Sequence, residues 1–262
     1  MNAAPKHRPP PQSEPGARAL YLAGAAPKRV AATDAALVVT TDKAQVLRYP
    51  VGRVARVVSR VDTVDWSGAA LALCLRAGIP ITWTDAQGHA LGAVYPHAAR
   101  PTALSTSLQV WAERPDGADL YANWLRQRRM AVLTHWAAQR KPHPAPSEWE
   151  QAKRRWVYQA HIDAHLPTGL RGLAQAYVAA QLDAIGLPPH LLGPTLERME
   201  LCEDLTHLLW ADMNLNTGHS ADTTADPATL TALFEKWLTH NGATLHVHLM
   251  ALQRTAHQHL YD

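Results

Sequence analysis

The sequence has few cysteines and lacks any long apolar run. Its 262 residues include two cysteines, Cys74 and Cys202, which lie in apolar, patterned stretches rather than in turns. Two isolated thiols exclude a disulfide framework and are typical of a reducing compartment, so we expect a cytoplasmic protein. No apolar stretch approaches the roughly 20 residues that a membrane-spanning helix requires, so we expect no membrane partner.

The chain also lacks a large excess of charge of either sign. Lys and Arg together number 25 and Asp and Glu 22, which gives a formal net charge of +3. A mildly basic balance permits a polyanionic partner such as nucleic acid without requiring one. The hydrophobic fraction of 47% excludes a largely disordered chain. Residues 1–17 are polar and rich in proline, so we expect a disordered lead-in there rather than a secretory signal.

Short β-branched runs dominate residues 18–97. In the first part of this region the runs recur roughly 8–12 residues apart, which is typical of an antiparallel sheet or small sandwich. Residues 66–78 change to a helical pattern, with Ser67 as the N-cap and Gly78 at the end. Two further strands are expected to flank a turn at 85–88.

After a linker at 98–107, the chain is expected to be helical from residue 108 to residue 262. Apolar residues recur there with a period near 3.6, and the first helical stretch is broken at 114–117. The sequence therefore predicts an α+β fold, in which a small N-terminal β domain (a sheet or sandwich plus one helix) precedes an all-α C-terminal domain. The later helices are expected at 147–165, 168–185, 195–214, 227–240 and 243–260.

An ordered set of features lies in residues 53–96: a strand, a helix that begins with serine, a Gly-Ile-Pro turn, an apolar strand, a glycine turn and a strand that ends in proline. In this order the features resemble the end of the N-terminal domain of the CRISPR-associated Cas1 family, the DNA integrase subunit of spacer acquisition. The resemblance covers residues 19–96 closely and 108–215 loosely. The residues that carry it are Ser67, Gly78, Ile79, Pro80, Gly88, Gly92, Pro96 and, further on, Gln109.

The resemblance implies a homodimer formed through the β domain and a divalent metal held by the helical domain. In the family a Glu, a His and an Asp hold the metal, a set that suits Mg²⁺ or Mn²⁺. That metal polarises a phosphate and stabilises the leaving oxygen when a DNA 3′-hydroxyl attacks a phosphodiester. The resemblance also implies partners: DNA with frayed or branched ends, and a small Cas2 subunit or a catalytic paralogue.

Glu148 is the candidate for the family's glutamate. It opens a predicted helix, with Ala152 four residues later and Trp156 on the same face, which matches the family's pattern. A simpler interpretation is also open, because a Glu in the first turn after Ser147 is a common capping preference.

The histidine and aspartate positions match the family less well. Pro194 and Thr195 stand where the family has its metal-binding histidine, and neither binds a metal well. Asp204 is present, and His207 replaces the second carboxylate of the motif. Because residues three apart share a helix face, Asp204 and His207 could hold a metal together, with His190 as another stand-in. Alternatively His207 is a partly buried polar residue with no ligand role.

A basic run is the candidate DNA-binding surface, because clustered Lys and Arg neutralise phosphates without reading sequence. It consists of Arg126, Arg128, Arg129, Arg140, Lys141, Lys153, Arg154 and Arg155.

Two other groups of residues allow two interpretations each. Four interleaved tryptophans could stack on frayed bases, but at helical spacing large aromatics are more often core. The histidines near the C-terminus resemble a metal cluster, yet His246 and His248 are two residues apart on a helix and therefore point apart. The tryptophans are Trp124, Trp136, Trp149 and Trp156.

Three hypotheses about function follow from these residues. The first is a Cas1-type protein of CRISPR adaptation that binds DNA for spacer integration with reduced or absent catalysis. The second is a working metal-dependent integrase or endonuclease, which uses Mg²⁺ or Mn²⁺ at a site rebuilt from Glu148, Asp204 and either His190 or His207. The third, from another class, is a non-catalytic structural or scaffold protein, for which no cofactor is expected.

Overall fold

The computed structural model describes residues 16–96, 102–187, 199–216 and 226–258. The chain forms two compact units. The first comprises Met1–Ala86 with Ala90–His97, and the second comprises Ala98–Asp262 with the short turn Gln87–His89. Among the described helices none is both long and apolar enough to cross a membrane.

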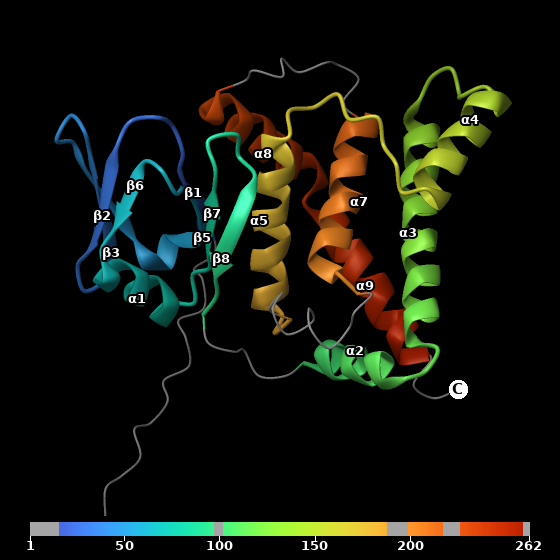
Figure 1. Ribbon diagram of the computed structural model, residues 1–262, viewed down its shortest axis with the longest axis horizontal. Coiled ribbons are helices and arrows are strands. Elements are labelled where there is room, and N and C mark those ends of the chain that lie inside the picture. Colours follow the sequence, from blue (N-terminus) through green and yellow to red (C-terminus); the bar gives the residue numbers. More distant parts are fainter. Residues whose placement is uncertain (1–15, 97–101, 188–198, 217–225, 259–262) are drawn as a thin grey trace, which may run out of the picture. The chain divides into compact units, whose positions relative to one another are not determined.

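Unit 1 contains two four-stranded sheets (Figure 1). In the first sheet the strand order is β1-β5-β7-β8, and β5 pairs in parallel with both β1 and β7. In the second sheet the order is β4-β3-β2-β6, with antiparallel pairing except between β2 and β6. The elements are β1 (Arg18–Leu22), β2 (Lys28–Ala32), β3 (Ala36–Thr41), β4 (Val46–Pro50), β5 (Val54–Arg60), β6 (Val64–Trp66), α1 (Gly68–Arg76), β7 (Ile81–Thr84) and β8 (Ala90–Val94).

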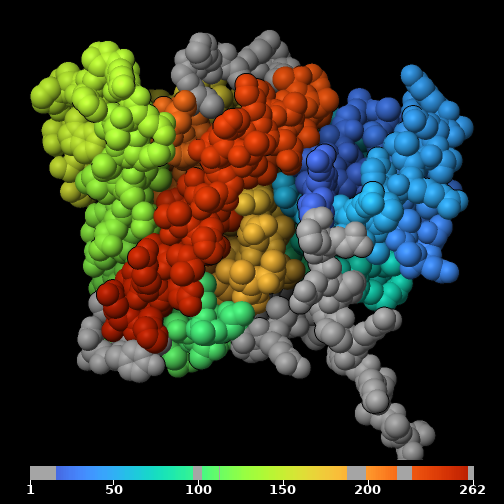
Figure 2. Space-filling model, turned by 180° about the vertical axis from the view of Figure 1, so that it is seen from behind, coloured from blue at the N-terminus to red at the C-terminus, as the bar shows by residue number. Residues whose placement is uncertain are grey.

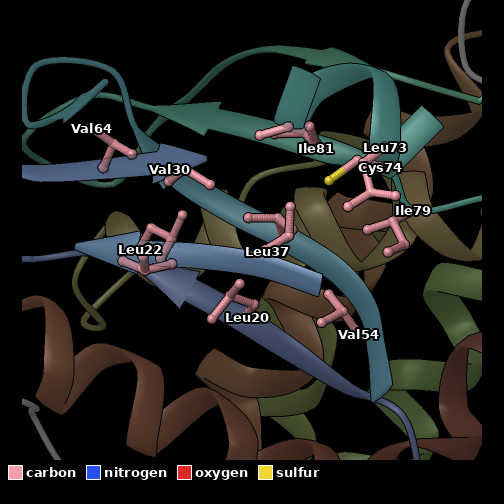
Figure 3. Packing of buried hydrophobic residues seen from close by; sticks show 13 residues of the cluster. Leu20, Leu22, Val30, Leu37, Val54, Val64, Leu73, Cys74, Ile79 and Ile81 are labelled. Atoms are coloured by element: carbon pink, nitrogen blue, oxygen red, sulfur yellow. The ribbon is translucent and has the colours of Figure 1, made fainter. Parts of the chain in front are cut away.

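One hydrophobic core joins the two sheets and α1 (Figure 3). Leu20 and Ile81 enter it from the first sheet, Val30 and Leu37 enter it from the second, and Cys74 enters it from α1. The burial of Cys74 raises the pKa of its thiol to about 12, so this cysteine is an inert packing residue. The core therefore makes unit 1 a single packed body rather than two separate sheets.

The helix α1 begins and ends as the sequence predicts. The Ser67 Oγ accepts a hydrogen bond of 3.2 Å from the backbone N–H of Ala70, which caps the first turn. At the other end Gly78 has a φ of 75°, the left-handed conformation that commonly terminates a helix.

Unit 2 is helical throughout its described residues. In Figure 1, α7 lies between α5 and α3 and packs against both. Figure 2 views the opposite face and shows α8 and α9 (red) lying over α5 and reaching α2 and α3 (green). The elements are α2 (Ala103–Glu113), α3 (Gly117–Gln139), α4 (Pro146–Lys153), a π-helical segment (Arg154–Tyr158), α5 (Gly169–Ala184), α7 (Leu201–Asn216), α8 (Pro227–Asn241) and α9 (Ala243–Gln258).

The observed architecture confirms the α+β prediction of an N-terminal β part followed by a helical part. The break expected at 114–117 is also present. A Cβ atom on Gly117 would lie 1.8 Å from the carbonyl oxygen of Trp111, so the tight turn from α2 into α3 requires glycine.

Two boundaries differ from the expectation. The helix α2 begins at Ala103, inside the stretch expected to be a linker, because Thr102 and Ser105 form a reciprocal capping box. The helix expected over 147–165 ends at Tyr158, because Ala160 adopts a positive φ of 54° that a right-handed helix excludes.

Candidate functional site

A buried tyrosine and a carboxylate connect α3 to α7. The Tyr121 hydroxyl, on the first turns of α3, donates a hydrogen bond of 2.8 Å to Oδ2 of Asp204 on α7. Tyr121 is 3% exposed, so its hydroxyl needs a partner within the protein. Burial raises the pKa of the Asp204 carboxyl, while the Tyr121 hydrogen bond and the positive charge of Arg129 act in the opposite direction.

Arg129 lies on the same helix, eight residues after Tyr121, which is about two turns. Its guanidinium carbon lies 5.7 Å from the centroid of the Trp156 ring, within cation–π range. The Trp156 indole N–H also donates a hydrogen bond of 2.9 Å to the backbone carbonyl of Arg129. Trp156, in the π-helical segment, therefore contacts both ends of this arginine.

His207 lies on the same face of α7 as Asp204, three residues later. Its ring meets Trp156 edge to face, with centroids 5.1 Å apart and an interplanar angle of 86°. Burial, with smaller contributions from the charges of Arg129 and Arg171, lowers the pKa of His207 to about 4. The imidazole is therefore neutral at neutral pH.

The remaining predicted ligands do not join this pair. Glu148 is exposed at the start of α4, where it forms an ion pair with Arg140. His190, Pro194 and Thr195 lie outside the described residues. Within the described ranges, no three His, Cys, Asp or Glu side chains are grouped so that they could hold a metal ion.

Comparison with known families places these observations in context. A model of the family described as CRISPR associated protein Cas1 matches residues 22–159, more than half of the chain. The chain belongs to the Cas1 family. A search of curated proteins found no match.

Solved Cas1 structures share the fold. A CAS1 protein from Thermotoga maritima, TM1797, is 14% identical, with a TM-score of 0.65 over 91% of this chain and 96% of that one. The structure of TtCas1 is 12% identical, with a TM-score of 0.62 over 92% and 97% of the two chains. A casposase bound to an integration product is 11% identical, with a TM-score of 0.60 over 92% and 90%. At these identities the comparison establishes the fold.

The described residues do not fit the hard divalent metal that the Cas1 family uses. Mg²⁺ requires several oxygen ligands in octahedral geometry. The structure describes three of the predicted ligands, Glu148, Asp204 and His207, and of these only Asp204 supplies a carboxylate on α7. One of its two oxygens accepts the Tyr121 hydrogen bond. The positive charge of Arg129 also acts on this carboxylate, while Glu148 pairs with Arg140 instead.

Two residues of this site escaped the sequence analysis. Tyr121 lies on the buried face of α3, and a buried tyrosine needs a hydrogen-bond partner for its hydroxyl. The helical period of the sequence already placed Tyr121 on that face, so this signal was present. Arg171 on α5 forms an ion pair with Glu203, the neighbour of Asp204. No local pattern pairs two residues 32 positions apart.

The predicted DNA-binding residues divide into paired and unpaired cations. Ion pairs join Arg140 to Glu148, Lys153 to Glu150 at 3.6 Å, and Arg155 to Asp163. Arg129 belongs to the Asp204 site and Arg128 is half-buried. The exposed members for which the described residues provide no ion pair are Arg126, Lys141 and Arg154.

The tryptophans and histidines follow the simpler interpretations. Trp124, Trp136 and Trp156 are 1%, 7% and 2% exposed, which confirms that they belong to the core, whereas Trp149 is only half-buried. On α9, His246 is exposed and His248 is buried, so the two point apart as the helical spacing predicts.

Proposed function

We propose that this chain is a Cas1-type protein of CRISPR adaptation, which binds DNA for spacer integration with reduced or absent intrinsic catalysis. One observation carries the second half of the proposal: Asp204, the predicted acidic ligand on α7, accepts a hydrogen bond from Tyr121. Phosphoryl transfer requires enough anionic oxygen to hold a cation against the attacked phosphate. Here the acid is already engaged by protein groups.

The proposed partners are DNA and other adaptation subunits. A TtCas1–DNA complex has a TM-score of 0.56 to this chain, and a Cas6-RT-Cas1–Cas2 complex has one of 0.57, with 36% of that longer chain covered. These relatives support DNA and a Cas2 subunit as partners of this chain. We propose further that the DNA has frayed or branched ends and that a catalytic paralogue can take the place of Cas2. We also propose a homodimer formed through the β domain at 18–97, and a cytoplasmic location.

A working integrase is the second candidate, because Asp204 and His207 do share one face of α7. In that case Glu148, Asp204 and His207, or His190 in place of His207, would form a rebuilt site. Mn²⁺ suits such a site better than Mg²⁺, since it tolerates a nitrogen ligand more readily.

Binding and strand transfer by the purified full chain separate these candidates. Fluorescence anisotropy with a branched DNA is expected to show binding that weakens steeply with salt and is equal in EDTA and in Mg²⁺. A strand-transfer gel is expected to show no Mg²⁺-dependent product and at most a weak product with Mn²⁺. Asp204→Asn keeps the acceptor for Tyr121 and serves as the matched variant. Strong Mg²⁺-dependent transfer that disappears in Asp204→Asn would contradict the non-catalytic proposal.

A further inference from the structure

The most exposed large apolar side chain in the described part of the chain is an aromatic ring. Tyr158, the last residue of the π-helical segment, is 62% exposed. Single exposed apolar residues are common on protein surfaces, so exposure alone assigns no role. This tyrosine differs from the others in two respects: its backbone is fixed by buried neighbours, and a positive charge lies beside it.

The backbone that carries Tyr158 is fixed by packing and hydrogen bonds. The two preceding residues, Trp156 and Val157, are buried, and the Trp156 indole N–H donates its hydrogen bond to a backbone carbonyl of α3. The backbone N–H of Gln159 donates a hydrogen bond of 3.3 Å to the carbonyl of Arg154, five residues earlier. Because the ring is presented from a fixed position, less entropy is lost when a ligand stacks on it.

Three consecutive cations lie just before the exposed ring, and two of them are neutralised locally. Lys153 pairs with Glu150 at 3.6 Å, and Arg155 pairs with Asp163. Arg154, between them, is exposed and has no ion pair with any residue that the structure describes. The surface around the ring therefore carries one unbalanced positive charge.

Arg154 and Tyr158 lie on one face of the segment, because residues four apart project to the same side of a helix. Trp156, two residues from each, faces the interior and contacts the ring of His207. A cation beside an exposed aromatic ring offers the two interactions that hold single-stranded nucleic acid, phosphate neutralisation and base stacking. A base inside a duplex has both faces covered by its neighbours, so the ring suits an unpaired base.

We infer that Tyr158 and Arg154 form a binding site for single-stranded DNA, in which the tyrosine ring stacks on an unpaired base and the arginine contacts a neighbouring phosphate. This inference rests on the proposed function, and it names the part of the DNA that these residues recognise. Because the site lies on the side of the segment away from His207, it is separate from the candidate metal ligands.

A duplex whose single-stranded overhang carries 2-aminopurine tests the site with the purified full chain. The fluorescence of this base analogue falls when the base stacks on an aromatic ring. At saturating protein, the complexes of the wild type and of Tyr158→Phe, which keeps the ring, should be dimmer than that of Tyr158→Ala. Tyr158→Ala should also bind the overhang DNA about five- to hundredfold more weakly, measured by anisotropy, with unchanged affinity for a blunt duplex.

Two further variants separate the roles of the two residues. Arg154→Gln should lower the slope of log affinity against log salt on the overhang DNA by about one unit, and its saturated complex should be as dim as that of the wild type. Leu91→Ala removes a similarly exposed apolar side chain from β8 and should change neither measurement. Since Tyr158 is exposed, Tyr158→Ala should melt at the wild-type temperature.

Two results would overturn the inference. One is equal fluorescence and equal affinity for the wild type and Tyr158→Ala on the overhang DNA, which would assign the tyrosine to a protein partner instead. The other is an equal loss of affinity for the blunt duplex, which would make Tyr158 a contact for any DNA. A wild type that binds neither DNA would contradict the proposed function itself, whereas the first two results leave that function standing.

Discussion

The hydroxyl of Tyr121 on α3 lies 2.8 Å from the carboxylate of Asp204 on α7 and donates a hydrogen bond to it. The two residues are 83 positions apart in the sequence. Hydrogen bonds to charged groups contribute roughly 1.5–3 kcal/mol to stability. We therefore expect Tyr121→Phe to lower the free energy of unfolding by about that amount, measured by urea denaturation at pH 7.

The matched control is Tyr158→Phe, because Tyr158 is 62% exposed. Its substitution should change the free energy of unfolding little. In an Asp204→Asn background the effect of Tyr121→Phe should be smaller, since the acceptor is then uncharged. Equal losses for Tyr121→Phe and Tyr158→Phe would contradict the assigned hydrogen bond.

Buried His248 on α9 predicts a loss of stability in mild acid. Burial, with a smaller contribution from Arg128, lowers its pKa to about 4, and neither ring nitrogen has a hydrogen-bond partner among the described residues. Between pH 6.5 and 4 the unfolded chain binds the proton that the folded chain rejects, so stability falls as the pH falls. The full effect is up to about 3 kcal/mol.

This pH effect is isolated by comparison with His248→Leu. The free energy of unfolding should decrease less steeply from pH 7 to pH 4.5 in His248→Leu than in the wild type. His246→Leu, at an exposed position on the same helix, should follow the wild-type curve. Parallel curves for all three proteins would show that the pKa of His248 is not lowered in the folded state.

The division of the basic residues predicts which of them contact DNA. Arg126 and Arg154 are exposed and have no ion pair among the described residues, whereas Arg140 and Arg155 are paired with carboxylates. Arg126→Gln/Arg154→Gln should lower the slope of log affinity against log salt by about two units. Arg140→Gln/Arg155→Gln should change it less. The reverse order would place the binding surface on the paired residues.

The proposed homodimer predicts a role for an edge strand of the second sheet. β4 is an edge strand, and Val46 on it is 56% exposed. Light scattering should show a dimer at roughly tens of micromolar, and Val46→Lys should favour the monomer because charge blocks edge pairing. Leu91→Lys, at a 60% exposed position on β8, an edge strand of the first sheet, is the control. A wild type that is only monomeric would count against the dimer.

The fold was largely predictable because its signals are local. The cap at Ser67, the terminator Gly78 and the helical period of the tryptophans each depend on neighbouring residues, and the structure confirms them. The positive φ of Ala160 was not predictable, since alanine rarely adopts that conformation. The capping box of Thr102 was present in the sequence, but the change of pattern there suggested a linker instead.

The candidate site was predictable only where it is local. Asp204 and His207 share a helix face by their spacing alone, and the structure places His207 against Trp156. The hydrogen bond between Asp204 and Tyr121 depends on how α3 packs against α7, which no sequence period encodes. This hydrogen bond engages an oxygen of the acid that a metal would need.

The strand order of unit 1 has a consequence for how the chain folds. Along the chain, β1 belongs to the first sheet, β2 to β4 belong to the second, and β5 belongs to the first again. β6 then belongs to the second sheet, and β7 and β8 complete the first. Neither sheet can therefore form from a continuous segment, and β1 must wait for β5 to be synthesised before it has a partner. Such non-local pairing slows folding, because the entropy of loop closure is lost before the contacts are gained. A nascent chain that ends at Pro50 would hold β2, β3 and β4 together while β1 remained unpaired.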